Sequence, residues 1–204
     1  LSAKRASISL RVNPKSAANV PVFPDIPVRF PVPASAPASR PASRAGEMRA
    51  MVLRHDGPLA ERPRPLALED MPVPEPRADA VRVRVRACGV CHTELDEIEG
   101  RTPPSALPRV LGHQIVGVID AVGSNARGVD IGQRVGVGWI YGACGVCALC
   151  ASGHENLCAR FEATGRDVDG GYAEFMVVPA AFTCPIPDVL TDGEAAPLLC
   201  AGSI

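Results

Sequence analysis

The chain has 204 residues, enough for one or two domains, and a hydrophobic content of 47% that is ample for a core. Its formal net charge of −1 hides a split: residues 1–47 hold seven Lys/Arg against two acidic residues, a net of +5, and the rest holds 14 basic and 20 acidic side chains, a net of −6. A mildly acidic body argues against a nucleic-acid partner or an anionic membrane surface.

Residues 1–47 are rich in Pro, Ala, Ser and Arg, and no apolar period survives this density of proline. The composition predicts a disordered extension. It is also that of an organellar transit peptide, although prolines interrupt any amphipathic helix here. Met48 opens an ordered pattern and resembles a natural start, so we interpret 1–47 as an upstream extension without function.

From Met48 to about Pro187 the chain reads as short strands separated by Gly and Pro, which predicts an all-β barrel or sandwich. Short helices are expected at His92–Ile98 and at Asp192–Cys200. The strand candidates are Met51–Leu53, Val81–Ala87, Val110–Val122, Arg134–Trp139 and Tyr172–Val178.

Four cysteines in the spacing C-x2-C-x2-C-x7-C predict a structural zinc site. They are Cys144, Cys147, Cys150 and Cys158. Four thiolates within 15 residues can surround one tetrahedral ion with little loop-closure cost. The alternatives are buried thiols or an iron–sulfur cluster, but no proline or further cysteine follows in the ferredoxin arrangement. His154, inside the loop, is expected to be exposed and not a ligand.

Cysteine usage also bears on the compartment. Eight cysteines could form a disulfide scaffold, but close CxxC steps suit a metal and no secretion signal is visible, so a cytoplasmic location is expected. The 19 residues from Val135 to Gly153 carry no charge, yet five glycines and three cysteines among them favour the metal loop over a membrane span.

Three further residues make up the ligand set of a catalytic zinc, namely Cys91, His113 and Cys200. Cys91 follows a strand in which Val and Arg alternate. Two thiolates and one imidazole leave a fourth coordination position open. Spacing alone does not show that the three converge, because cysteine is often simply buried and a lone histidine before an apolar strand is often a core residue.

The chain over about 48–204 resembles the zinc-dependent alcohol dehydrogenases of the medium-chain dehydrogenase/reductase superfamily. The matching motifs, in the family's order, are GVCHTE (89–94), GHQ with its following glycines (112–126), GQRVGV (132–137), the four-cysteine loop (144–158), DGGYAEF (169–175) and PLLCAG (197–202). The resemblance implies a GroES-like β-barrel over 48–191 and two zinc ions per chain, the catalytic one held by Cys91, His113 and Cys200.

By the same resemblance, Thr93 relays the proton of an alcohol, and His92 binds cofactor phosphate or ribose and extends the relay. From the residues alone, Thr93 is equally a candidate helix N-cap. Two departures from the family pattern stand out: Glu94 replaces an aspartate and is one methylene longer, and Gln114 replaces a glutamate and cannot carry charge. Cys88 and Cys184 have no matching ligand role and are interpreted as packing residues.

The family's nicotinamide cofactor, NAD or NADP, requires a βαβ unit with G-x-G-x-x-G. Gly136-Val-Gly138 is the nearby G-x-G, but a metal loop follows it instead of a helix. Residues 192–204 are therefore expected to begin the link to a Rossmann domain that this sequence lacks, and the chain is expected to be inactive alone. An inactive zinc-binding module and a zinc interaction finger are the alternatives. The complete enzyme is expected to be a homo-oligomer that acts on a small alcohol or aldehyde.

Overall fold

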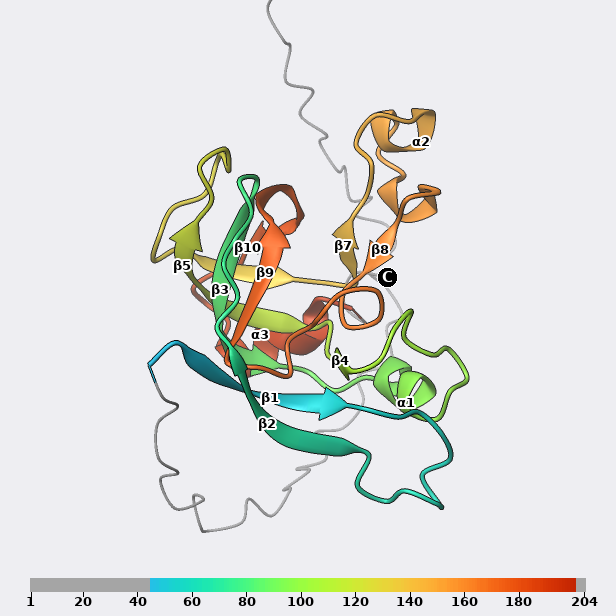
Figure 1. The fold of residues 1–204 in the computed structure, drawn as a ribbon. Coiled ribbons are helices and arrows are strands. Elements are labelled where there is room, and N and C mark those ends of the chain that lie inside the picture. Colours follow the sequence, from blue (N-terminus) through green and yellow to red (C-terminus); the bar gives the residue numbers. More distant parts are fainter. Residues whose placement is uncertain (1–44, 201–204) are drawn as a thin grey trace, which may run out of the picture. The chain divides into compact units, whose positions relative to one another are not determined.

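Short antiparallel strands dominate the computed structural model, which describes residues 45–200 (Figure 1). The mainly β fold is confirmed. Residues 1–44 of the predicted extension and the last four residues lie outside the described part. The strands are β1 (Glu47–Leu53), β2 (Leu66–Pro72), β3 (Ala80–Cys88), β4 (Arg109–Val110), β5 (Ile115–Val122), β6 (Arg134–Val137), β7 (Ile140–Gly142), β8 (Glu162–Ala163), β9 (Phe175–Pro179) and β10 (Cys184–Pro185).

The larger sheet has five strands in the order β10-β6-β5-β3-β9. In its strand β3 the alternation of valine and arginine works as predicted: Val81 and Val83 are fully buried, while Arg82 lies outside and pairs with Asp120 on β5 at 2.9 Å. The core on the inner face is aliphatic, and its buried members are Val81, Val83, Ile115, Ile119, Val135, Val137, Tyr141, Met176, Val178 and Ala180.

The smaller sheet has the order β2-β1-β4, and it joins the larger one through the residues just before β9. The backbone N–H of Met51 donates to the carbonyl of Tyr172 at 2.8 Å, and Ala50 forms a bridge with Ala173. The strand predicted at Tyr172–Val178 therefore divides: its first residues pair with β1, and β9 itself begins only at Phe175. Strand β2 was not predicted from the sequence. Its residues are mostly exposed, and apolar and polar side chains do not clearly alternate along it.

The strand predicted over Val110–Val122 is wrong as one element. The chain forms β4, leaves extended pairing for four residues, and resumes as β5 at Ile115. The reason is Gly112, whose φ of +98° is a left-handed conformation that interrupts a strand. Two of the buried residues in the interruption are His113 and Gln114.

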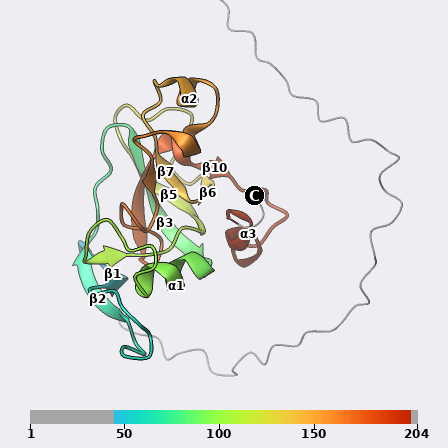
Figure 2. The same cartoon turned by 90° about the vertical axis from the view of Figure 1, so that its right-hand side faces the viewer.

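Helix α3 (Asp192–Leu198) packs on the face of the larger sheet opposite the main core (Figure 2). Ala195 and Ala196 are buried against Val116 of β5. Thr191 caps the helix by accepting the N–H of Glu194 at 3.3 Å. The helix ends two residues before the predicted Cys200, and its role as the start of an interdomain link stays a prediction. Among residues 45–200, no helix has the length and apolar character needed to cross a membrane.

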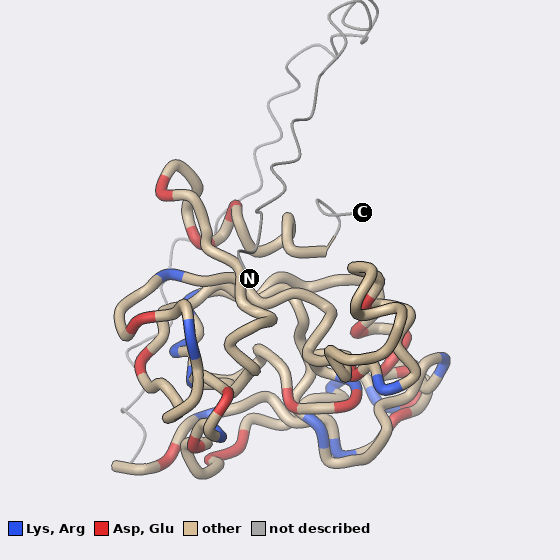
Figure 3. The backbone as a smooth tube through the Cα atoms, turned by 90° about the horizontal axis from the view of Figure 1, so that it is seen from above, with Lys and Arg blue, Asp and Glu red and all other residues tan. Residues whose placement is uncertain are grey.

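The four-cysteine loop forms a lobe of its own beyond β7 and β8, with the short helices α2 (Ala148–Ala151) and η1 (Glu155–Leu157) (Figure 1). A further single turn, η2 (Ala180–Phe182), follows β9. Acidic and basic residues are interleaved along the described chain (Figure 3), and many of them are joined in ion pairs such as Arg49 with Glu174 at 2.6 Å.

Helix α1 (His92–Ile98) has the bounds predicted from the sequence, and it buries two carboxylates. Glu94 is 2% exposed and accepts the backbone N–H of Cys91 at 2.8 Å, which closes the first turn. Glu97 is 1% exposed, and neither of its oxygens has a hydrogen-bond partner. Burial, reinforced by the charge of Glu94, raises the pKa of Glu97 to about 8.

The buried carboxyl of Glu97 predicts a pH dependence of stability. A folded-state pKa of about 8 against an ordinary 4.5 means that the folded chain holds an extra proton between these values, so stability falls as pH rises through this window. Relative to Glu97→Gln, the wild type should lose up to about 1.4 kcal/mol of unfolding free energy per pH unit there. Urea unfolding at a series of pH values measures the difference.

Glu61→Gln, which removes an exposed carboxyl, is the matched control for this measurement. It should leave the pH profile of the wild type unchanged. Parallel profiles for wild type and Glu97→Gln would show that Glu97 is ionised in the folded chain throughout this range.

Candidate metal centres

The four cysteines of the lobe converge as their spacing predicts. The Sγ atom of Cys150 lies 3.8 Å from that of Cys144 and 3.6 Å from that of Cys147, and the Sγ atoms of Cys147 and Cys158 are 3.9 Å apart. A tetrahedron with Zn–S bonds of about 2.3 Å has S–S edges of about 3.8 Å. The cluster therefore fits a structural zinc site.

The electrostatics of this cluster also favour a cation. Backbone N–H groups of Val146 and Cys147, with help from Arg160, lower the pKa of Cys144 to about 5. Burial raises the pKa of Cys150 to about 12. Without an ion the two thiols would thus ionise at very different pH values. A central dication would stabilise the thiolate form of every cysteine that ligates it. His154 is exposed, as predicted, and its Nδ1 lies 3.0 Å from the hydroxyl of Ser152.

A second cluster brings together residues that are far apart in the sequence. Cys91 comes from the start of α1, His113 from the break between β4 and β5, and Cys200 from the residues after α3. Their ligand atoms all lie within 4.8 Å of one another. The convergence that spacing alone could not establish is thus a property of the fold.

The imidazole of His113 is held from two sides. Its Nδ1 lies 2.6 Å from Oε1 of Glu94, and the ring is 1% exposed. Its centroid lies 5.0 Å from that of Trp139 with the rings at 79°, an edge-to-face contact. A carboxylate at Nδ1 leaves Nε2 as the free nitrogen of the ring, which is the arrangement found around metal-ligating histidines. The extra methylene of Glu94 thus still reaches the histidine.

Gln114 lies beside the same cluster and is 3% exposed. Its backbone carbonyl accepts the N–H of Gly89 at 2.9 Å, and a Cβ added to Gly89 would collide with its side chain. The side chain of Gln114 hydrogen-bonds to Cys200, which lowers the pKa of this thiol against a larger opposing effect of burial. A neutral amide can donate to a thiolate, and a carboxylate cannot.

The remaining predicted residues lie around α1. The alternative prediction that Thr93 is the N-cap of α1 is wrong, because Cys91 occupies the N-cap position. The hydroxyl of Thr93 instead lies 3.6 Å from the Sγ of Cys91. His92 is exposed, on the first turn. Cys88 packs against the main core, as expected.

A cavity of about 690 Å³ opens onto the Cys91–His113–Cys200 cluster. Thr93, His113 and Cys200 line one end of it, and its walls are mostly apolar: Gly138, Trp139, Ile140, Asn156, Phe182, Cys184, Leu198 and Leu199. Cys184 was interpreted as a packing residue, but it is exposed and lines this cavity. Polar groups at one end of an apolar cavity are typical of a site for a small organic ligand.

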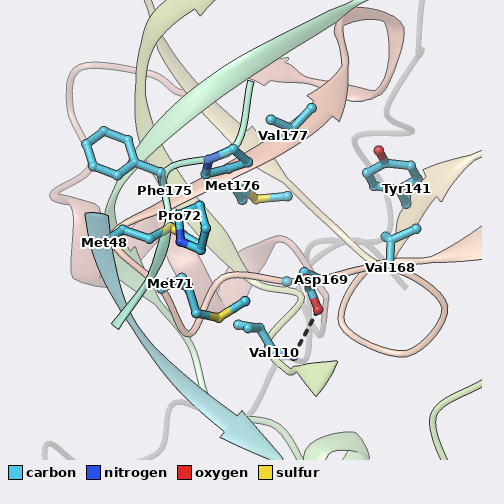
Figure 4. A pocket seen from close by; sticks show the side chains of 13 residues that line it. Met48, Met71, Pro72, Val110, Tyr141, Val168, Asp169, Phe175, Met176 and Val177 are labelled. Carbon is cyan, nitrogen blue, oxygen red and sulfur yellow. Dashed lines mark hydrogen bonds between the residues drawn. The ribbon is translucent and has the colours of Figure 1, made fainter. Parts of the chain in front are cut away.

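A separate cavity of about 380 Å³ lies between β1, β2 and β9 and contains no cysteine or histidine (Figure 4). Met48, Met71 and Met176 line it. Its one carboxylate, Asp169, is engaged by the backbone N–H of Val110 at 3.0 Å and by Arg109 at 3.2 Å. Apart from Asp169 and the hydroxyl of Tyr141, the side chains that line this cavity are apolar.

Comparison with known proteins agrees with this geometry. Residues 77–188 match the alcohol dehydrogenase GroES-like domain family. An alcohol dehydrogenase of Geobacillus stearothermophilus is 45% identical over 140 residues, which cover 68% of this chain and 42% of that protein. The chain spans less than half the length of the curated relatives that it matches.

Solved structures give the same result. One described as an NAD-dependent alcohol dehydrogenase is 39% identical with a TM-score of 0.68, over 74% of this chain and 43% of that one. A thermostable alcohol dehydrogenase of Pyrobaculum aerophilum, described as bound to cobalt and zinc, is 30% identical with a TM-score of 0.67, over 74% and 44%. The family match covers more than half of the sequence, and the chain belongs to the alcohol dehydrogenase GroES-like domain family, within the zinc-dependent medium-chain dehydrogenases.

Proposed function

We propose that this chain is the catalytic part of a zinc- and NAD(P)-dependent alcohol dehydrogenase that oxidises a small alcohol to an aldehyde or ketone. The observation that carries the proposal is the Cys91–His113–Cys200 cluster at one end of an apolar cavity. Two thiolates and one imidazole are the ligands of a catalytic zinc with an open position. Relatives described as alcohol dehydrogenases, one of them bound to zinc, support the same reaction.

A bound zinc would supply Lewis-acid chemistry, which lowers the pKa of an alcohol in the open position. The residues of the chain would do the rest. Cys91 and Cys200 would offset the charge of the ion, and Glu94, with Oε1 2.6 Å from Nδ1 of His113, would orient the imidazole. Thr93 stands at the cavity with its hydroxyl beside Cys91, where it can accept the proton of the alcohol. His92, exposed one residue away, is in a position to pass that proton outward.

The nicotinamide would be held by a nucleotide-binding domain of the complete protein. The described residues contain no strand–glycine–helix unit of the kind that binds a dinucleotide. The four-cysteine cluster would hold a second, structural zinc, which gives two ions per chain. A small alcohol or aldehyde as substrate and homo-oligomer formation remain predictions of the family resemblance. The cytoplasmic location remains a prediction from the cysteine usage.

Metal content tests the two-zinc proposal directly. The purified chain should hold about two zinc ions, and Cys200→Ser should hold about one, because it removes a ligand from one cluster only. Cys184→Ser is the matched control: it lies in the same cavity but outside both clusters. Mass spectrometry under native conditions counts the ions in each variant.

A wild type with a single zinc that Cys200→Ser retains would leave only the structural site, and the chain would then be the inactive zinc-binding module. Alcohol-dependent reduction of NAD⁺ or NADP⁺ by the protein that contains this chain joined to a nucleotide-binding domain tests the reaction itself. Absence of activity in that protein, with both zinc ions in place, would refute the dehydrogenase.

Gln114→Glu is expected to change turnover more than zinc content. The amide of Gln114 donates to Cys200, whereas a glutamate there would place a carboxylate against a thiolate and make the zinc less electron-deficient. We expect kcat to change by at least about threefold, roughly 0.7 kcal/mol of barrier, at unaltered zinc stoichiometry. Steady-state kinetics of the protein joined to its nucleotide-binding domain, beside metal analysis, measure both. Equal kinetics for the wild type and Gln114→Glu would contradict this role of Gln114.

A further inference from the structure

Trp139 forms part of the wall of the larger cavity and is the sole tryptophan of the chain. One contact holds its indole at the metal end, the edge-to-face packing on His113 at 5.0 Å between centroids. A second contact comes from outside the cavity, where the guanidinium carbon of Arg166 lies 5.3 Å from the ring centroid. The indole therefore lies between a predicted metal ligand and a cation.

The backbone of Trp139 is fixed by the same loop that carries Arg166. The N–H of Thr164 donates to the carbonyl of Trp139 at 2.9 Å, and its hydroxyl donates to the carbonyl of Gly138 at 2.8 Å. Thr164 is fully buried, so these bonds are shielded from water. With the main chain fixed, the remaining freedom of Trp139 is rotation of its side chain.

Arg166 is itself oriented by a neighbour. Its Nη2 donates to Oδ2 of Asp167 at 2.9 Å and its Nε to Oδ1 at 3.3 Å, so the carboxylate binds one edge of the guanidinium through two hydrogen bonds. Asp167 in turn accepts the backbone N–H of Ala163 at 2.8 Å. The paired and anchored carboxylate of Asp167 holds the guanidinium of Arg166 in place over the ring.

The loop packs closely against the segment that carries His113. Gly165 has φ +84°, and a Cβ added there would lie 2.9 Å from the backbone nitrogen of Gly112, the residue before His113. The carbonyl of Arg166 accepts the N–H of Ser105 at 3.1 Å. The loop thus links the segment that presents His113 to the cation that covers Trp139.

We propose that Arg166 is a positioning residue: its guanidinium, which lies over the ring, holds the indole of Trp139 against His113 and so sets the width of the substrate cavity beside the metal. The claim about alcohol specificity rests on the proposed function, whereas the claim about the indole does not. The ion pair of Arg166 with the adjacent Asp167 could form without Trp139, and an ion pair at a surface contributes little to stability. Stacking on the indole face is the contact that a guanidinium makes well and an ammonium makes less well.

The sole tryptophan makes the first test direct. Time-resolved fluorescence anisotropy of Trp139 in the zinc-loaded chain should show only overall tumbling for the wild type. Arg166→Ala should add a fast local component and raise the acrylamide quenching constant about twofold, with Arg166→Lys between the two. Arg54→Ala is the matched control, because it removes the same charge and breaks a bidentate pair with Glu69 at 2.7 Å on both oxygens.

A rigid indole in both Arg166→Ala and Arg166→Lys would overturn the proposal, as would equal mobility in Arg54→Ala. Should Arg166→Ala fail to fold, Arg166→Lys against wild type decides by the same readout. The second test is kinetic, on the protein joined to its nucleotide-binding domain. Arg166→Ala should change the ratio of kcat/KM for cyclohexanol over ethanol by about fivefold, mainly through KM.

An unchanged ratio beside a mobile indole would overturn the specificity part. A wild type without alcohol oxidation would refute the proposed function, and the anisotropy result would still decide the role of Arg166.

Discussion

The site depends on close packing around one residue without a side chain, Gly112. A Cβ there would lie 2.7 Å from the ring of Tyr172 and 2.9 Å from the Sγ of Cys88, and the φ of +98° disfavours any other residue. The carbonyl of Gly112 accepts the N–H of Gly171 at 2.9 Å, which ties the segment before His113 to the one that pairs with β1. The turn at Gly112 thus sets where His113 meets Glu94 and Trp139.

Two neighbours surround the cluster at His113: an anionic side chain, Glu94, and a neutral one, Gln114. Glu94 closes the first turn of α1 with one oxygen and faces His113 with the other, so the same carboxylate couples helix geometry to imidazole orientation. Gln114, on the other side, contributes an amide donor toward Cys200. Two departures from the family pattern therefore occupy complementary places: the longer acid keeps its contact, and the lost acid is replaced by a hydrogen-bond donor.

Features that depend on residues close together in the chain could be predicted from the sequence. The Val/Arg alternation of β3, the bounds of α1 and the convergence of the four lobe cysteines all follow from residues within about 15 positions of one another. Cys91, His113 and Cys200 could be joined only through the family resemblance, because their meeting depends on the packing of α3 against β5. The only sign in the sequence of the break between β4 and β5 is Gly112 itself. The prediction of one strand over Val110–Val122 did not take this glycine into account.

Other elements could not be read from the sequence for identifiable reasons. Strand β2 lies at the edge of its sheet and is largely exposed, so burial imposes no alternation on it. The roles of Trp139 and Arg166 depend on contacts between segments 27 residues apart that share no motif. In the sequence, Glu97 is one of several charged residues on a short helix. Its burial follows from the packing of α1, which also buries Glu94 beside His113.

The architecture of the cysteine lobe has a consequence for how such chains can diverge. The lobe leaves and re-enters the body through the paired strands β7 and β8, where Ile140 lies opposite Ala163, so its two ends are already neighbours. Its interior consists of thiols and not of aliphatic side chains shared with the main core. A deletion across the lobe would therefore leave the pairing of the two sheets in place, although it would remove Asn156 from the wall of the larger cavity.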